Sequence, residues 1–240
     1  MVTPAPAPAP APATGPFRAG LVDVAPVLVG LVPFALVLGA LAAAKGLSPL
    51  EVMLMSGLVF AGGSQFVAVE LWRDPVPLGA LALTALLVNV RHLLMGAALV
   101  PRADGWGGRA WPALFFMADE VWALALRRAG DDGQVPLGYW LGLSAGLWLN
   151  WVALTGVGAW LGAAVEDPTR LGFDFAFVAV FVALLRGMWR DRTTLLPWAA
   201  SAVVAALVKL AVDGPWYVAA GALAGLAVAV FTARPEERPV

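Results

Sequence analysis

Long apolar runs separated by short polar stretches dominate the chain from residue 17 onward. About 20 helical residues at roughly 1.5 Å each cross the hydrocarbon core of a membrane, and most of these runs reach that length. The runs cover about Leu21–Ala44, Ser48–Leu71, Pro77–Val100, Trp111–Arg128, Leu137–Val165, Leu171–Trp189, Leu195–Ala211 and Trp216–Ala233. This pattern predicts an all-α, polytopic membrane helix bundle with about eight spans, forming one domain over residues 17–233 with a short polar tail at 234–240.

The second run has the most informative pattern. Ser48, Pro49 and Glu51 predict a helix start, because Ser-x-x-Glu forms a capping box and proline suits the first turn. The run then stays apolar up to Phe60 and is interrupted by the sequence AGGSQ at residues 61–65. Adjacent glycines let a helix unwind, and backbone loosened inside a membrane must face protein or a water-filled cavity. We therefore expect a helix broken near the membrane midplane that lines a solute site.

The residues of this run expected to line the site are Phe60, Gly62, Gly63, Ser64 and Gln65. Close helix packing through small residues is the alternative explanation for the two glycines and the serine. It does not account for the neighbouring glutamine.

Polar residues inside the third run are further candidates. Arg91 lies about ten residues, or roughly 15 Å of helix, before the end of the run, which is too deep for easy snorkelling. Asn89 and His92 are three residues apart and are expected to share a helix face. Arg91 points elsewhere and could pair with an acid of the fourth run. A buried ion pair that only fixes helix packing is the alternative.

The fourth run carries Asp119 and Glu120 at its centre. An ionised carboxylate at the membrane midplane costs about 3 kcal/mol, so it persists where it is used or paired. We expect these acids to bind a substrate ammonium group or to carry a proton, and an interfacial helix with its acids in water is the alternative. Asn150 in the fifth run is either a site residue or an interhelical hydrogen-bond donor. In the last run, Gly221 and Gly225 suggest a packing face.

The fourth run, at 18 residues, also decides the topology. If it spans, there are eight spans and both termini lie on one side; if it is re-entrant, seven spans remain and the N-terminus moves outside. In the eight-span arrangement, nine arginines lie on the side of the termini and four basic residues on the other, so the positive-inside rule places both termini in the cytoplasm. The seven-span arrangement gives a similar bias. We favour eight because the run is just long enough and its acids could face the bundle interior.

Composition narrows the function classes. Hydrophobic residues make up 61% and charged residues 13% of the chain, and the mean hydropathy is +0.83, so a soluble core could not hide this apolar surface. The net charge of −1 gives no electrostatic support for nucleic-acid binding. Without cysteine and with one histidine, we expect no metal site, no cofactor and no enzyme activity. The sequence lacks a P-loop motif, so a gradient rather than bound ATP would supply energy.

Residues 1–16, MVTPAPAPAPAPATGP, differ from the rest of the chain. Alternating proline and alanine favour extended chain without a core, so we expect a disordered tail. The tail lacks a basic region followed by an apolar region and a cleavage site, and it is therefore not expected to be a signal peptide.

Four motifs, in this order, resemble those of the azaleucine-resistance (AzlC-type) permeases. They are GLSPLEVMLMSGLVFAGGSQFVAVELW at residues 46–72, LLVNVRHLLMGAALVP at 86–101, FFMADEVWALAL at 115–126 and LGFDFAFVAVFVALL at 171–185. The resemblance covers about residues 17–231. It implies export of branched-chain amino acids such as L-valine across the bacterial cytoplasmic membrane, a small hydrophobic AzlD-type partner subunit and coupling to protons. The chain departs from the family in its Pro/Ala tail and in reading Ala-Asp-Glu at 118–120, where relatives often have Thr-Asp-Glu.

An amino-acid zwitterion needs donors for its carboxylate, an anion or carbonyl groups for its ammonium group, and an apolar pocket for its side chain. Backbone N–H groups at residues 63–65 or Arg91 could supply the first, and Asp119, Glu120 or unwound carbonyls the second. Candidates for the apolar pocket are Phe60, Phe66, Phe115 and Phe116.

Two other classes stay open. A transporter of a different small solute could use the same architecture. A membrane scaffold that only anchors a partner is also conceivable, although it would not need the deep ionisable residues Arg91, Asp119 and Glu120.

Overall fold

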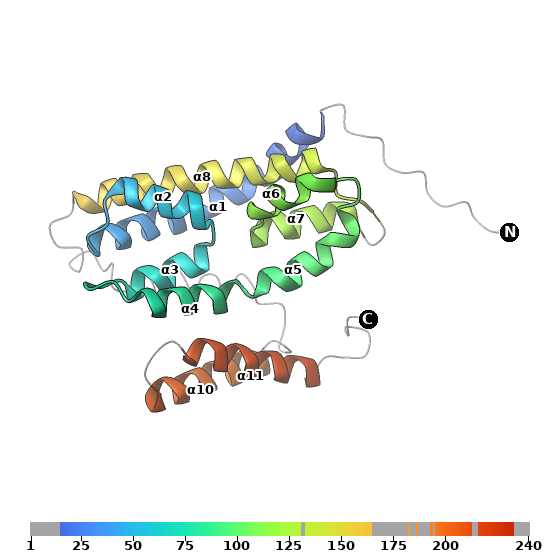
Figure 1. Ribbon diagram of the computed structural model, residues 1–240. Coiled ribbons are helices and arrows are strands. Elements are labelled where there is room, and N and C mark those ends of the chain that lie inside the picture. Colours follow the sequence, from blue (N-terminus) through green and yellow to red (C-terminus); the bar gives the residue numbers. More distant parts are fainter. Residues whose placement is uncertain are drawn as a thin grey trace. The chain divides into compact units, whose positions relative to one another are not determined.

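The structure, a computed structural model, describes residues 15–130, 133–164, 195–212 and 216–232, together with positions 182, 186 and 193. These residues form helices and connecting turns without a strand (Figure 1), which confirms the all-α membrane class. The α-helices are α1 (Pro16–Ala44), α2 (Pro49–Val59), α3 (Gly62–Leu71), α4 (Leu78–Asn89), α5 (Arg91–Leu99), α6 (Ala110–Phe115), α7 (Asp119–Ala129), α8 (Leu137–Ala163), α10 (Leu195–Ala211) and α11 (Trp216–Thr232). Two 3-10 helices, η1 (Val100–Arg102) and η2 (Gly107–Arg109), lie between α5 and α6.

Three of the described helices are long and apolar enough to cross a membrane. They are Pro16–Ala44, Leu78–Arg102, which comprises α4, α5 and η1, and Leu137–Ala163. Shorter apolar helices occupy Pro49–Val59, Leu195–Ala211 and Trp216–Thr232. The sixth predicted run, at 171–189, lies outside the described residues apart from positions 182 and 186, and so does the tail up to residue 14.

The chain divides into two compact units. Unit 1 consists of Met1–Val32 and His92–Trp151, and unit 2 of Pro33–Arg91 and Val152–Val240. Helices α1 and α8 each contribute residues to both units. The single domain expected over residues 17–233 stays a prediction.

The fourth apolar run is not the single helix that the sequence pattern suggested. Helix α6 ends at Phe115, the chain leaves helical geometry at residues 116–118, and α7 begins at Asp119. At 6 and 11 residues, neither helix alone reaches the roughly 20 needed to cross the hydrocarbon core. Carboxylates are favoured at the positive N-terminal end of a helix, which explains why a new helix starts at Asp119 and Glu120.

Buried tryptophans hold unit 1 together. Trp140 on α8 donates from Nε1 to the carbonyl of Ala113 on α6 at 2.9 Å, and both residues are buried. Trp106, also buried, donates from Nε1 to the carbonyl of Val135 at 2.8 Å, and the two indoles lie 5.4 Å apart between centroids. Each indole therefore fills apolar space and satisfies a buried carbonyl at the same time.

Glycines bring α1 and α8 into close contact in each unit. In unit 1, a Cβ on Gly20 would lie 2.8 Å from the backbone nitrogen of Leu143. In unit 2, a Cβ on Gly39 would lie 2.5 Å from the backbone nitrogen of Ala159 and would overlap the carbonyl of Thr155. Only glycine permits these approaches, as is common where membrane helices pack closely.

Glycines also allow close packing between the last two described helices, α10 and α11. A Cβ on Gly221 of α11 would lie 2.9 Å from the Cβ of Ala205 on α10, and one on Gly225 would lie 3.0 Å from the Cβ of Ser201. The packing face predicted from Gly221 and Gly225 is confirmed.

Gly39→Ala should destabilise the protein by about 1–3 kcal/mol, because the added methyl group meets backbone atoms that no rotamer change can move. Gly30→Ala, on the same helix, is the matched control, since a Cβ there has no described atom within 4 Å. Alanine is favoured over glycine inside a helix by about 0.5–1 kcal/mol, so the control should be neutral or slightly stabilising. Thermal unfolding of the detergent-purified chain measures both, and equal effects of the two substitutions would contradict the proposed packing.

Candidate functional site

The second apolar run is a broken helix, as the sequence predicted. Ser48 caps α2, with its backbone N–H donating to Glu51 Oε2 at 2.7 Å in the expected capping box. The helix ends at Val59, and Phe60 adopts a left-handed conformation with φ 45° and ψ 44°. Helix α3 then starts at Gly62. The break therefore falls at Phe60 and Ala61, and the two glycines expected to unwind instead form the first residues of α3.

At this break only two residues separate two helix ends of opposite polarity. The last turn of α2 carries partial negative charge on its carbonyl groups, and the first turn of α3 carries partial positive charge on its N–H groups. Ala61, which precedes α3, provides no side-chain cap to those N–H groups. The arrangement suits a small ligand that carries both an anionic and a cationic group.

A buried polar junction fixes the two helix ends. Gln65 Nε2 on α3 donates to Ser56 Oγ on α2 at 3.0 Å, and Thr155 Oγ1 on α8 donates to the same oxygen at 2.9 Å. All three side chains are at most 1% exposed. We call these three residues the Ser56 junction. Gln65 therefore joins α3 to α2 across the break.

Residues of α4 and α5 reach the first turn of α3. Asn89 Nδ2 donates to Ser64 Oγ at 3.3 Å, and Ser64 Oγ donates to the carbonyl of Ala61 at 3.0 Å. A Cβ on Gly63 would lie 3.7 Å from Arg91 Nη2, so the guanidinium group lies beside the N-terminal end of α3. The predicted site residues that unit 2 brings together are Phe60, Gly62, Gly63, Ser64, Gln65, Asn89 and Arg91.

The remaining predicted site residues belong to unit 1. Asp119 is exposed and Glu120 half-buried in the first turn of α7, and His92 is half-buried in the first turn of α5. Asn150 Nδ2 donates to the carbonyl of Leu28 at 3.5 Å, which is the interhelical contact considered from the sequence. The pairing of Arg91 with an acid of α7 joins residues of different units and stays a prediction.

Sequence reasoning missed the hydroxyl groups that surround the break. Ser56, Thr84 and Thr155 are not among the candidates that the sequence pattern singled out. Thr84 on α4 is 1% exposed, and its Oγ1 has no hydrogen-bond partner among the described residues. The available signal was a lone serine or threonine inside an apolar run, a pattern that is too common to identify a site by itself.

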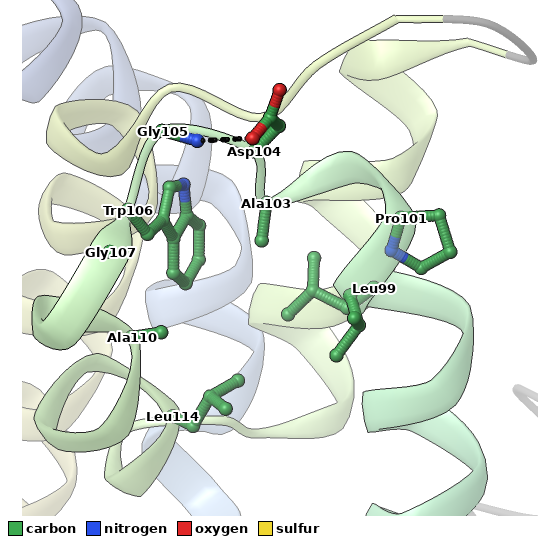
Figure 2. A pocket seen from close by; sticks show the side chains of 10 residues that line it. Leu99, Pro101, Ala103, Asp104, Gly105, Trp106, Gly107, Ala110 and Leu114 are labelled. Carbon is green, nitrogen blue, oxygen red and sulfur yellow. Dashed lines mark hydrogen bonds between the residues drawn. The ribbon is translucent and has the colours of Figure 1, made fainter.

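Unit 1 also contains a cavity of about 400 Å³ between the end of α5 and the start of α6 (Figure 2). Its lining is mostly apolar and comes from Leu99, Val100, Pro101, Ala103, Asp104, Gly105, Trp106, Gly107, Ala110 and Leu114. Asp104 Oδ1 accepts from the backbone N–H of Gly105 at the rim. None of the predicted site residues lines this cavity, so it is separate from the helix break.

Ser56→Ala should destabilise the protein by about 1–3 kcal/mol, because it removes the acceptor of two buried hydrogen bonds. A double-mutant cycle with Thr155→Val should show a coupling energy of about 0.5 kcal/mol or more, since both changes remove the same contact. Thr232→Val is the control, because its hydroxyl bonds only to carbonyls of its own exposed helix turn. Thermal unfolding in detergent gives these values, and strictly additive effects would refute the junction.

Comparison with known proteins places the chain in a family. The model of the AzlC protein family matches residues 26–165, which contain every predicted site residue. The inner membrane protein YgaZ of Escherichia coli (strain K12) is 29% identical over 240 residues, covering 97% of this chain and 96% of that protein. A membrane protein of Archaeoglobus fulgidus is 30% identical over 173 residues, covering 70% of this chain and 74% of that protein.

The name of a third relative states a transport function. The branched-chain amino acid transport protein AzlC of Bacillus subtilis (strain 168) is 29% identical over 175 residues, covering 72% of this chain and 68% of that protein. No solved structure matches the chain. The family model and these relatives together show that the chain belongs to the AzlC family of membrane transport proteins, and not to a family of enzymes.

Proposed function

We propose that this protein exports branched-chain amino acids such as L-valine across the bacterial cytoplasmic membrane. The observation that carries the proposal is the break between α2 and α3, where opposite helix ends meet beside a guanidinium group. The name of the Bacillus subtilis relative supports the substrate class.

The carboxylate of the substrate binds at the first turn of α3. Backbone N–H groups of Gly62 and Gly63 point out of the helix end, and the Arg91 guanidinium lies beside Gly63. Asn89 and Ser64 hold each other at the same end and can supply further polar contacts. Glycine is suited to these positions because it lets a ligand approach the backbone closely.

The ammonium group and the side chain of the substrate use the other side of the break. Carbonyl groups at the end of α2 attract the ammonium group, and Asp119 or Glu120 of α7 are proposed as further anionic groups. Phe60 and Phe66 are buried residues of the break and of α3, which makes them candidates for the apolar pocket. A pocket of this kind favours aliphatic over charged side chains.

Export also needs an energy source and a defined orientation. We propose coupling to the proton gradient, assembly with a small hydrophobic AzlD-type subunit, and cytoplasmic termini, as the family resemblance and the distribution of arginines suggest.

Everted vesicles from cells that produce the full chain, with and without the small subunit, would be supplied with labelled valine or lysine. Valine accumulation that needs both the chain and a proton gradient would support the proposal, whereas equal handling of lysine would favour a different substrate.

Arg91→Gln should raise the KM for valine about tenfold or more in these vesicles, because a charge-assisted bond to a carboxylate is worth about 1.5–3 kcal/mol. Arg109→Gln, on an exposed 3-10 turn, is the matched control and should leave the KM within about twofold. An unchanged KM for Arg91→Gln, at a normal amount of protein in the membrane, would remove Arg91 from the site.

Asp119→Asn tests the proposed anion on α7. If the carboxylate faces the substrate ammonium group, valine transport should fall at least tenfold while the membrane level of the protein stays normal. Asp104→Asn, in the loop between η1 and η2, is the control for loss of one negative charge. Full valine transport by Asp119→Asn would show that this acid is only a surface residue.

A further inference from the structure

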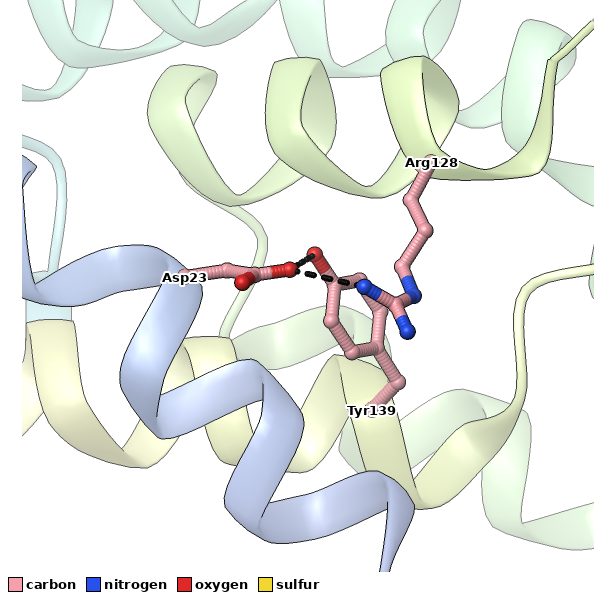
Figure 3. Close-up of polar contacts among 3 residues, drawn as sticks. All are labelled: Asp23, Arg128 and Tyr139. Atoms are coloured by element: carbon pink, nitrogen blue, oxygen red, sulfur yellow. Dashed lines mark hydrogen bonds and ion pairs between the residues drawn. The ribbon is translucent and has the colours of Figure 1, made fainter. Parts of the chain in front are cut away.

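A second polar cluster lies in unit 1, apart from the predicted site residues (Figure 3). Arg128 Nη1, in the last turn of α7, donates to Asp23 Oδ2 on α1 at 3.0 Å. The hydroxyl of Tyr139, near the start of α8, donates to the same oxygen at 2.8 Å. The Arg128 guanidinium also lies 4.8 Å from the centroid of the Tyr139 ring. One carboxylate oxygen therefore joins three helices.

Asp23 has an unusual place in the chain. Within the three described helices that are long enough to cross a membrane, it is the only carboxylate. It lies seven residues after the start of α1, or about 10 Å along the helix axis. A carboxylate within an apolar span is costly unless it has a partner or a use, and such residues commonly mark proton pathways.

The cluster is only partly buried in the protein. The side chains of Arg128 and Asp23 are 40% and 34% exposed, so the carboxylate is neither sealed in the protein nor fully solvated. Proton exchange at the carboxylate therefore does not require the packed core of unit 1 to open. Among the described residues, Arg127 on α7 also acts electrostatically on Tyr139, and Arg18 lies five residues before Asp23 on α1.

A proton and Arg128 compete for the same carboxylate. The ion pair joins Arg128 to the ionised carboxylate, and protonation of Asp23 removes the charge attraction that holds Arg128. The neutral carboxyl group can keep its hydrogen bond with Tyr139, whereas Arg128 retains its charge and turns toward water. Loss of this contact frees the C-terminal end of α7, the helix whose first turn carries Asp119 and Glu120.

We propose that Asp23 is the proton-binding carboxylate of the transporter and that Arg128 is its exchangeable partner. This inference rests on the proposed function as a proton-coupled transporter and assigns the coupling ion to particular residues. In each cycle one proton binds Asp23 on one side of the membrane and leaves it on the other, and α7 alternates between a state held by Arg128 and a released state.

Valine accumulation in everted vesicles, with and without an imposed pH gradient, tests the proposal. Asp23→Asn cannot bind or release a proton, so the ratio of accumulation with the gradient to that without it should fall to about one. Asp23→Glu should restore a gradient response, because it returns a carboxylate to the site. Asp104→Asn, which removes an exposed loop carboxylate, should keep the wild-type ratio. A wild-type ratio in Asp23→Asn would overturn the proposal.

Arg128→Gln provides a second test that does not depend on the stability of Asp23→Asn. Without the guanidinium group no cation competes with the proton, so the ratio of accumulation with the gradient to that without it should change by about twofold or more. Arg127→Gln is the matched control and should keep the wild-type ratio. An unchanged ratio in Arg128→Gln would refute the competition. If wild-type vesicles accumulate no valine at all, the proposed function fails; if they do and both variants behave as wild type, only this inference fails.

Discussion

Lipid offers no hydrogen bonds, so a helix can be interrupted inside a membrane only where protein groups fix its ends. In unit 2 this is done at a single oxygen atom, Ser56 Oγ, which accepts from Gln65 and from Thr155. The Ser56 junction therefore links α2, α3 and α8 at the point where the helix is interrupted. The position of the first turn of α3, and hence of the groups proposed to bind a carboxylate, depends on this contact.

The two units fix their interrupted segments by different means. In unit 2 the interruption is two residues long, and neutral hydroxyl and amide groups hold it. In unit 1 the buried Trp140 bonds to α6 just before the interruption between α6 and α7, and the far end of α7 is held by an ion pair. The contacts in unit 2 are between neutral groups, whereas the contact between Asp23 and Arg128 joins two charged groups.

Much of the fold follows from the sequence pattern, because apolar runs of membrane length have few alternatives to helix. The end of α1 at Ala44, the start of α8 at Leu137 and both ends of α10 fall where the hydrophobic pattern placed them. The capping box at Ser48 and Glu51 and the packing of Gly221 were also predictable, since both are local motifs.

The fourth run shows where this reasoning fails. Hydrophobic length alone cannot distinguish one helix of 18 residues from two short ones, and the acids at 119 and 120 acted as a helix start rather than as the middle of a span. The Ser56 junction was also out of reach, because Thr155 lies 99 residues from Ser56 and nothing local in the sequence links them. The cluster around Asp23 has the same origin: its partners on α7 and α8 are more than 100 residues away.

The left-handed backbone conformation of Phe60 limits which substitutions evolution can accept at this position. A residue with a Cβ atom pays about 1–2 kcal/mol in the left-handed region, which glycine enters freely. Glycine at this position would keep the backbone geometry and relieve that strain, but it would also delete the aromatic ring proposed to contact the substrate. Selection for heat resistance should therefore favour glycine at position 60, whereas selection for substrate discrimination should favour phenylalanine.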